Sequence, residues 1–102
     1  MAYADALSAE EIEERLGQLP GWEVEEGRTL QRTYRLAHLP AAIFAVHIAG
    51  IQAELNHHSD LTLGYDTLHV AITTHAAGGR LTDKDFGLAA RIDAVAPGHG
   101  AQ

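Results

Sequence analysis

Residues 61–75, LTLGYDTLHVAITTH, decide the fold because they contain two strands and the turn between them. From 67 to 74 apolar and polar side chains alternate, which is typical of a strand with one buried face. That face carries Leu68, Val70 and Ile72. Leu61 to Tyr65 forms the partner strand, and the Tyr65-Asp66 pair marks the turn. We therefore expect an antiparallel hairpin here.

A second hairpin precedes this one in the chain. Residues 22–25 and 29–36 have the composition of two short strands, separated by a Glu26-Gly27 turn. In the second strand, Leu30, Tyr34 and Leu36 alternate with polar side chains. The chain thus predicts four strands in two hairpins.

Three helices are expected around these hairpins. Ser8 and Glu11 form a capping box that opens the first helix, and Gly17 ends it. Pro40 suits the first turn of a long, largely apolar helix that ends near Asn56. A second capping box at 82–85 opens the third helix, which continues to about 95.

The order α-β-β-α-β-β-α predicts an α+β fold, with a four-stranded antiparallel sheet and three helices on one face. One face and the outer strand edges would remain uncovered. A chain this small is therefore expected to form a homo-oligomer, a homodimer or homotetramer.

Length and composition favour a single domain over residues 1–102, with an ordered core at about 7–96 and frayed ends at 1–6 and 97–102. The 102 residues are 46% hydrophobic and 21% charged, which is near the globular average. The N-terminal stretch lacks the features of a signal peptide, and no apolar run reaches the ~20 residues of a membrane span. We therefore expect a cytoplasmic protein.

Charge and cysteine content exclude several functions. Seven basic against 14 acidic residues give a net charge of −7, which argues against binding nucleic acid or an anionic membrane. No cysteine is present, which rules out disulfides, thiolate metal sites and cysteine nucleophiles.

The unusual feature is the histidine content. Seven histidines occur in the chain, and four of them lie between 57 and 75. Asn56-His57-His58-Ser59-Asp60 follows the long helix and His75 follows the last strand, so the two segments are expected to converge on one cleft. Imidazole titrates near neutrality, and converging imidazoles can both donate and accept protons on one substrate.

Other interpretations of the histidines remain open. His38, His47, His69 and His99 are each expected to be surface or structural residues. The adjacent pair at 57–58 can equally stabilise the C-terminal end of a helix. Three histidines with Asp60 could ligate zinc or iron, but the spacings typical of metal ligands are absent, so we predict no metal site.

In combination, these segments resemble pterin-4a-carbinolamine dehydratases over about residues 7–96. The resemblance is carried by AELNHHSD at 53–60, Tyr65, VAITTH at 70–75, Gly79 and LTDKD at 81–85. Upstream, LSAEE at 7–11 and Gly21-Trp22 also match the family.

The resemblance implies an enzyme, a hydro-lyase that removes water from 4a-hydroxytetrahydropterin to give quinonoid dihydropterin in cofactor recycling. Pterin would be the substrate, and no cofactor or metal is implied. Its catalytic residues would be His57, His58 and His75. The substrate would also contact Asn56, Thr73, Thr74 and Ala76.

Several positions differ from the family pattern. Ser59 stands where proline is usual, Ala53 where glutamate is usual, and Asn56 where aspartate is frequent. The loop between His75 and Asp85 is one residue longer, with Arg80 as the candidate insertion. The same fold also serves non-catalytic proteins, dimerisation coactivators and Rubisco assembly factors, and such a binding or assembly protein is the alternative function.

Overall fold

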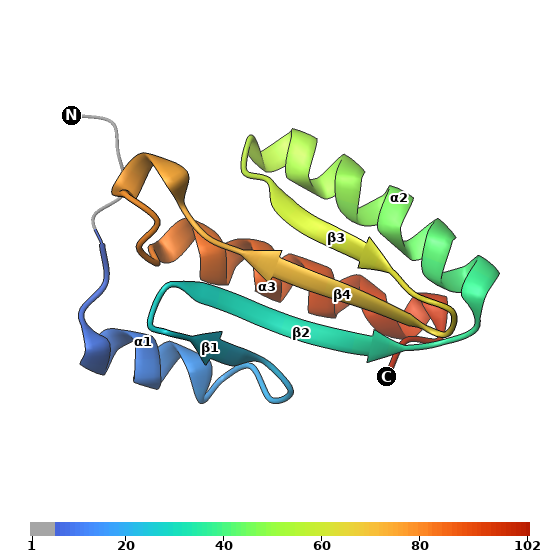
Figure 1. Cartoon of the computed structure of the whole chain (residues 1–102), viewed down its shortest axis with the longest axis horizontal. Helices are drawn as coiled ribbons and strands as arrows, with labels where there is room; N and C mark the ends of the chain where they lie inside the picture. The colour runs from blue at the N-terminus through green and yellow to red at the C-terminus, as the bar shows by residue number, and fades with distance from the viewer. Residues whose placement is uncertain (1–5) are drawn as a thin grey trace.

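The computed structural model describes residues 6–102, apart from the side chain of Ala76. The elements follow the predicted order (Figure 1). They are α1 (Ala9–Leu16), β1 (Glu23–Glu25), β2 (Thr29–Arg35), α2 (His38–Leu55), β3 (Ser59–Leu63), β4 (Thr67–Ile72), the 3-10 helix η1 (His75–Ala77), α3 (Asp83–Val95) and the 3-10 helix η2 (Ala96–His99).

The four strands form one antiparallel sheet in the order β1-β2-β4-β3. The central pair aligns Leu30 with Ile72 and Tyr34 with Leu68, so the alternating apolar residues of both strands meet on one face. All four of these side chains are fully buried. The predicted fold class is confirmed.

The helices cover this apolar face. α3 runs behind the sheet in Figure 1, and α2 packs against β3, β4 and α3. α1 adds Ile12 and Leu16 to the same core. Both predicted capping boxes are present, at the starts of α1 and α3.

A polar cluster joins β2 to α3 at the edge of this core. The carboxylate of Asp93 accepts hydrogen bonds from Trp22 Nε1 at 3.0 Å, from Arg32 Nη1 at 3.1 Å and from the hydroxyl of Tyr34. Burial of Tyr34, together with its bond to Asp93, raises the pKa of its hydroxyl well above the ordinary value.

The uncovered face of the sheet is polar, whereas exposed apolar side chains gather on α2. Gln31, Thr33 and His69 project from the open face, as their register opposite the buried residues requires. On α2, in contrast, Leu39, Ile43 and Val46 are 68%, 52% and 73% exposed. That the protein forms an oligomer remains a prediction. The exposed apolar side chains of α2 are the surface that such an oligomer would bury.

Several predicted boundaries were wrong, and the strands expected over 29–36 and 67–74 end at 35 and 72. β3 begins at Ser59, directly after the histidine pair, and ends at 63 rather than 65. The segment 97–102 is not frayed: Gln102 exchanges two backbone hydrogen bonds with Arg35, of 2.8 and 3.1 Å, and His99 stacks on Phe44. The remaining prediction of fraying, at 1–5, lies outside the described residues.

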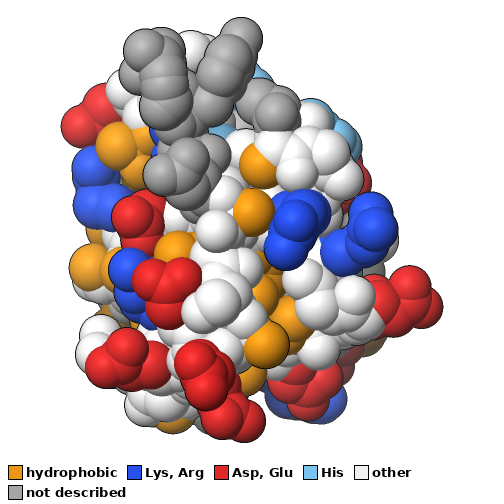
Figure 2. All heavy atoms as spheres, turned by 90° about the vertical axis from the view of Figure 1, so that its left-hand side faces the viewer, with side chains coloured by type: hydrophobic (Ala, Val, Ile, Leu, Met, Phe, Trp, Pro, Cys, Tyr) orange, Lys and Arg blue, Asp and Glu red, His pale blue; other side chains and the backbone are white. Residues whose placement is uncertain are grey.

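One helix has the length of a membrane span. α2 is long and apolar enough to cross a membrane by length and composition, with mean hydropathy 1.2, yet Phe44, Ile48 and Ile51 are buried in the protein core. Figure 2 shows one end of the molecule, where acidic side chains are most numerous in the lower half and basic side chains lie on both sides, mostly at mid-height.

Candidate active site

The chain leaves α2 through a left-handed residue. Asn56 ends the helix with φ 53° and ψ 43°, a conformation that asparagine tolerates better than most residues. The amide of His57 then donates to the carbonyl of Gln52 at 3.0 Å. This turn gives adjacent histidines different environments: His57 is 9% exposed, while His58 is exposed to solvent.

The residue that follows the two histidines also holds this turn. The buried Gln52 side chain accepts two hydrogen bonds through Oε1, from the amide of Ser59 at 3.0 Å and from the Ser59 hydroxyl. The first residue of β3 is thereby tied to the last turns of α2, and the two histidines lie between the tied ends.

A buried carboxylate holds the inner histidine. His57 Nε2 lies 2.8 Å from Oδ1 of Asp85, which has no exposed surface. The other oxygen, Oδ2, accepts from the Thr74 hydroxyl at 2.7 Å and from the Thr82 amide at 2.8 Å. One carboxylate therefore caps α3, anchors the end of β4 and orients His57.

This arrangement determines which nitrogen of His57 carries the proton. An ionised carboxylate only accepts hydrogen bonds, so Nε2 of His57 must donate to Asp85. In the neutral ring, Nδ1 then keeps its lone pair, and no described residue donates a hydrogen bond to it. His57 is thus prepared to accept a proton through Nδ1.

The third histidine lies at the same end of the sheet, because the end of β4 pairs with the start of β3 at Ser59 and Ile72. β4 is followed by η1, which starts at His75, and the chain returns through Gly78 and Gly79, both at positive φ (+70° and +80°). The hydroxyl of Thr73 donates to the Gly79 carbonyl at 3.0 Å, which holds this return. His75 is exposed at the start of the loop.

These segments meet in one pocket of about 330 Å³. It is lined by Asn56, His57, His58, Thr73, Thr74, His75 and Lys84. The structure thus brings together every predicted substrate-binding residue except Ala76, whose side chain lies outside the described part. A smaller hollow of about 60 Å³ joins His58, Thr73 and His75 to Asp60 on the open side of the sheet.

Two residues of the site were not identified from the sequence. Asp85 was expected only as the third residue of a capping box, and the capping bond does use Oδ2. A carboxylate has a second oxygen, however, which can bind another group. The high number of histidines nearby in the sequence was the available indication that a histidine would be its partner. Lys84 gave no such signal, because an exposed lysine in a first helical turn is common.

The other histidines lie outside this pocket. His38 Nδ1 contacts the Gly64 carbonyl at 2.9 Å, His69 pairs with the Thr33 hydroxyl at 2.8 Å, and His47 pairs with His99 at 2.8 Å. They are surface or structural residues, as predicted. Within residues 6–102 no three histidine and carboxylate side chains gather as a metal-ligand set.

Sequence comparisons point to one family. Residues 5–95 match the family model described as pterin 4 alpha carbinolamine dehydratase. A protein of Streptomyces coelicolor with the provisional name pterin-4-alpha-carbinolamine dehydratase is 56% identical over 99 residues, covering 96% of this chain and 97% of its own. A protein of Chloroflexus aggregans with the same provisional name is 48% identical over 90 residues, covering 87% and 95%.

A solved structure shares the fold. A protein from Brucella melitensis, described as a transcriptional coactivator/pterin dehydratase, superimposes with a TM-score of 0.82. It is 25% identical, and the match covers 88% of this chain and 97% of that chain.

Proposed function

Because the chain belongs to the pterin-4a-carbinolamine dehydratase family, we propose that it removes water from 4a-hydroxytetrahydropterin to give quinonoid dihydropterin. The observation that carries this proposal is the convergence of His57, His58 and His75 on one pocket. The buried Asp85 behind His57 supports it, because it prepares one of the three rings to accept a proton.

The reaction needs one proton donor and one proton acceptor. The hydroxyl on C4a departs as water, so its oxygen must receive a proton, while the proton on N5 must be removed. The electron pair of the N5–H bond then forms the new N5–C4a double bond, and the C4a–O bond breaks. Two positioned imidazoles, one charged and one neutral, supply both transfers.

The environments of the histidines suggest their roles. His57 acts as the base, because its bond to Asp85 leaves Nδ1 free to accept. His75 is exposed and can recover its proton from water, so we assign it the proton donor. His58, also exposed beside the pocket, orients the ring. No cofactor or metal takes part in this scheme, and we place the protein in the cytoplasm.

Stopped-flow absorbance tests the proposed reaction. A 4a-hydroxytetrahydropterin is generated in the mixing cell, and its decay is followed with and without the purified protein. We expect decay to accelerate in proportion to protein concentration. If the decay rate equals the spontaneous rate at every concentration, the protein is not a dehydratase.

We further propose that the protein assembles as a homodimer or homotetramer through α2. Leu39, Ile43 and Val46 are spaced to lie along one side of the helix, and Glu54 is the only acidic or basic residue other than histidine in α2. Each copy has a net charge of −7, so the repulsion between two copies is weakest when they meet through a surface with few acidic side chains, as on α2. Light scattering should give a multiple of 11.0 kDa that falls toward the monomer mass in Ile43→Glu. A wild-type mass of one chain at micromolar concentration contradicts this.

The second candidate function is that of a non-catalytic protein that binds a partner. The same apolar side of α2 favours it, and the Brucella melitensis neighbour is described as a coactivator as well as a dehydratase. This candidate takes the lead if the stopped-flow experiment shows no acceleration.

A further inference from the structure

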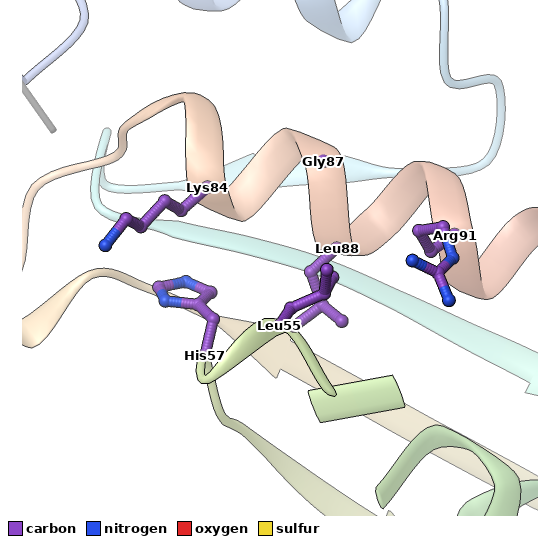
Figure 3. Close-up of a pocket in the computed structure, with 6 residues that line it drawn as sticks. All are labelled: Leu55, His57, Lys84, Gly87, Leu88 and Arg91. Carbon is purple, nitrogen blue, oxygen red and sulfur yellow. The ribbon is translucent and has the colours of Figure 1, made fainter. Parts of the chain in front are cut away.

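A second pocket of about 330 Å³ adjoins the histidine pocket on the side of α3. It is lined by Leu55, His57, Lys84, Gly87, Leu88 and Arg91 (Figure 3). His57 and Lys84 line both pockets. A ligand whose ring occupies the histidine pocket can therefore extend a substituent past these two side chains without leaving the protein surface.

The second pocket has an apolar middle and cationic ends. Figure 3 shows Leu55 and Leu88 between Lys84 on one side and Arg91 on the other. Gly87 leaves room along α3, since nothing lies within 4 Å of the position that a Cβ would take. Lys84 and Arg91 are seven residues apart on one helix, so about two turns, or roughly 10 Å, separate their backbones.

The charges of this pocket stand out in an acidic chain. Only seven of the 102 residues are lysine or arginine, and two of them line this pocket. Arg91 Nη2 binds Oε1 of Glu54 at 3.0 Å, whereas Lys84 has no acidic partner within 4.0 Å among residues 6–102. An anion that reaches the pocket thus meets one unpaired ammonium group and one guanidinium group that it can share with Glu54.

We propose that this pocket binds the side chain at C6 of the pterin, and that the preferred side chain has a flat apolar linker and a carboxylate end. A pterin joined through aminobenzoate to glutamate has this chemistry. The linker would lie on Leu55 and Leu88, and a carboxylate would pair with Arg91. A short neutral dihydroxypropyl chain would instead place its hydroxyls against apolar side chains, where they lose hydrogen bonds to water. The inference rests on the proposed function, because it needs the ring in the histidine pocket.

Equilibrium binding of two oxidised pterins tests the inference. Pteroylglutamate carries the anionic side chain and biopterin the neutral one, and both are titrated into the full-length protein by calorimetry. We expect pteroylglutamate to bind roughly tenfold more tightly. Arg91→Gln should reduce this preference about three- to fivefold, the range of one partly exposed ion pair. Glu54→Gln removes the competing carboxylate and should increase the preference.

Arg35→Gln is the matched control, since it also removes an exposed arginine paired with an acid, here Asp66 at 3.6 Å. It should leave the preference unchanged. Equal binding of the two pterins, or a preference that neither Arg91→Gln nor Glu54→Gln moves, overturns the inference and leaves the proposed reaction intact if the stopped-flow decay is accelerated. Absence of binding by both pterins together with an unaccelerated decay overturns both.

Discussion

Replacing Asp85 by asparagine should disable His57 while preserving the fold. The carboxylate has three partners, and two of them, the Thr82 amide and the Thr74 hydroxyl, meet Oδ2 at 2.8 and 2.7 Å. A backbone amide can only donate, so the single oxygen of asparagine must stay at the Oδ2 position. The new amide NH₂ then faces Nε2 of His57 in place of Oδ1.

A donor in that place reverses the tautomer of the ring. Nε2 of His57 has to accept, and its proton moves to Nδ1, the nitrogen assigned to take the proton from N5. Losing a general base costs about 10²- to 10⁴-fold in rate. We expect kcat of Asp85→Asn to fall within this range, with KM changed much less, because the pocket keeps its shape.

The change in stability should be modest. One charge-assisted hydrogen bond contributes about 1.5–3 kcal/mol, which a domain of this size tolerates. Stopped-flow decay of 4a-hydroxypterin measures the rate, and thermal melting measures the fold. Asp83→Asn is the control, since Asp83 is a carboxylate two residues earlier on α3, 68% exposed and paired with Arg15. A folded Asp85→Asn variant with wild-type kcat would refute the assigned role of His57.

Four other outcomes are expected. His75→Ala should lower the rate at least about tenfold with little change in melting temperature, whereas the same change at His69, bonded to Thr33, should alter neither. Strong chelators should leave activity unchanged, and metal analysis should find no stoichiometric zinc or iron. Gln52→Leu leaves the Ser59 amide without its acceptor and should lower the free energy of unfolding by about 1–3 kcal/mol, measured by urea titration. Tyr34 has a raised pKa in the folded state, so its stabilisation is complete below the unfolded value of 10.0 and is lost above it. Between pH 10 and 11 the wild type should lose about 1 kcal/mol more than Tyr34→Phe.

The sequence predicted the fold because its signals are local. The alternation over 67–74 and the capping residues Ser8 and Thr82 can each be recognised from residues only a few positions apart in the chain. The errors arose where a long-range partner decides. The start of β3 depends on pairing Ser59 with Ile72, and the order of the last residues depends on Arg35, 67 positions away from Gln102.

The candidate site was predictable to the same extent. Histidines stand out in composition, and their places after a helix and a strand indicated one cleft, which the structure shows as the pocket shared by His57, His58 and His75. The contribution of Asp85 was hidden because a capping box accounts fully for an aspartate at that position. Its second oxygen acquires a role only when α2 and α3 pack side by side.

The turn that carries His57 and His58 is held in place although residues around it differ from the family pattern. A proline after the two histidines would restrict the backbone through its ring. Ser59 lacks that restriction, yet its amide and hydroxyl both bind the buried Oε1 of Gln52, so two hydrogen bonds hold the same turn. Ala53 is exposed, and the glutamate one place later binds Arg91 beside the second pocket. The orientation of His57 depends on Asp85 and on the helix end at 56, neither of which these departures disturb. For this reason we expect the chain to retain catalysis, although proline and glutamate are absent from the positions where the family has them.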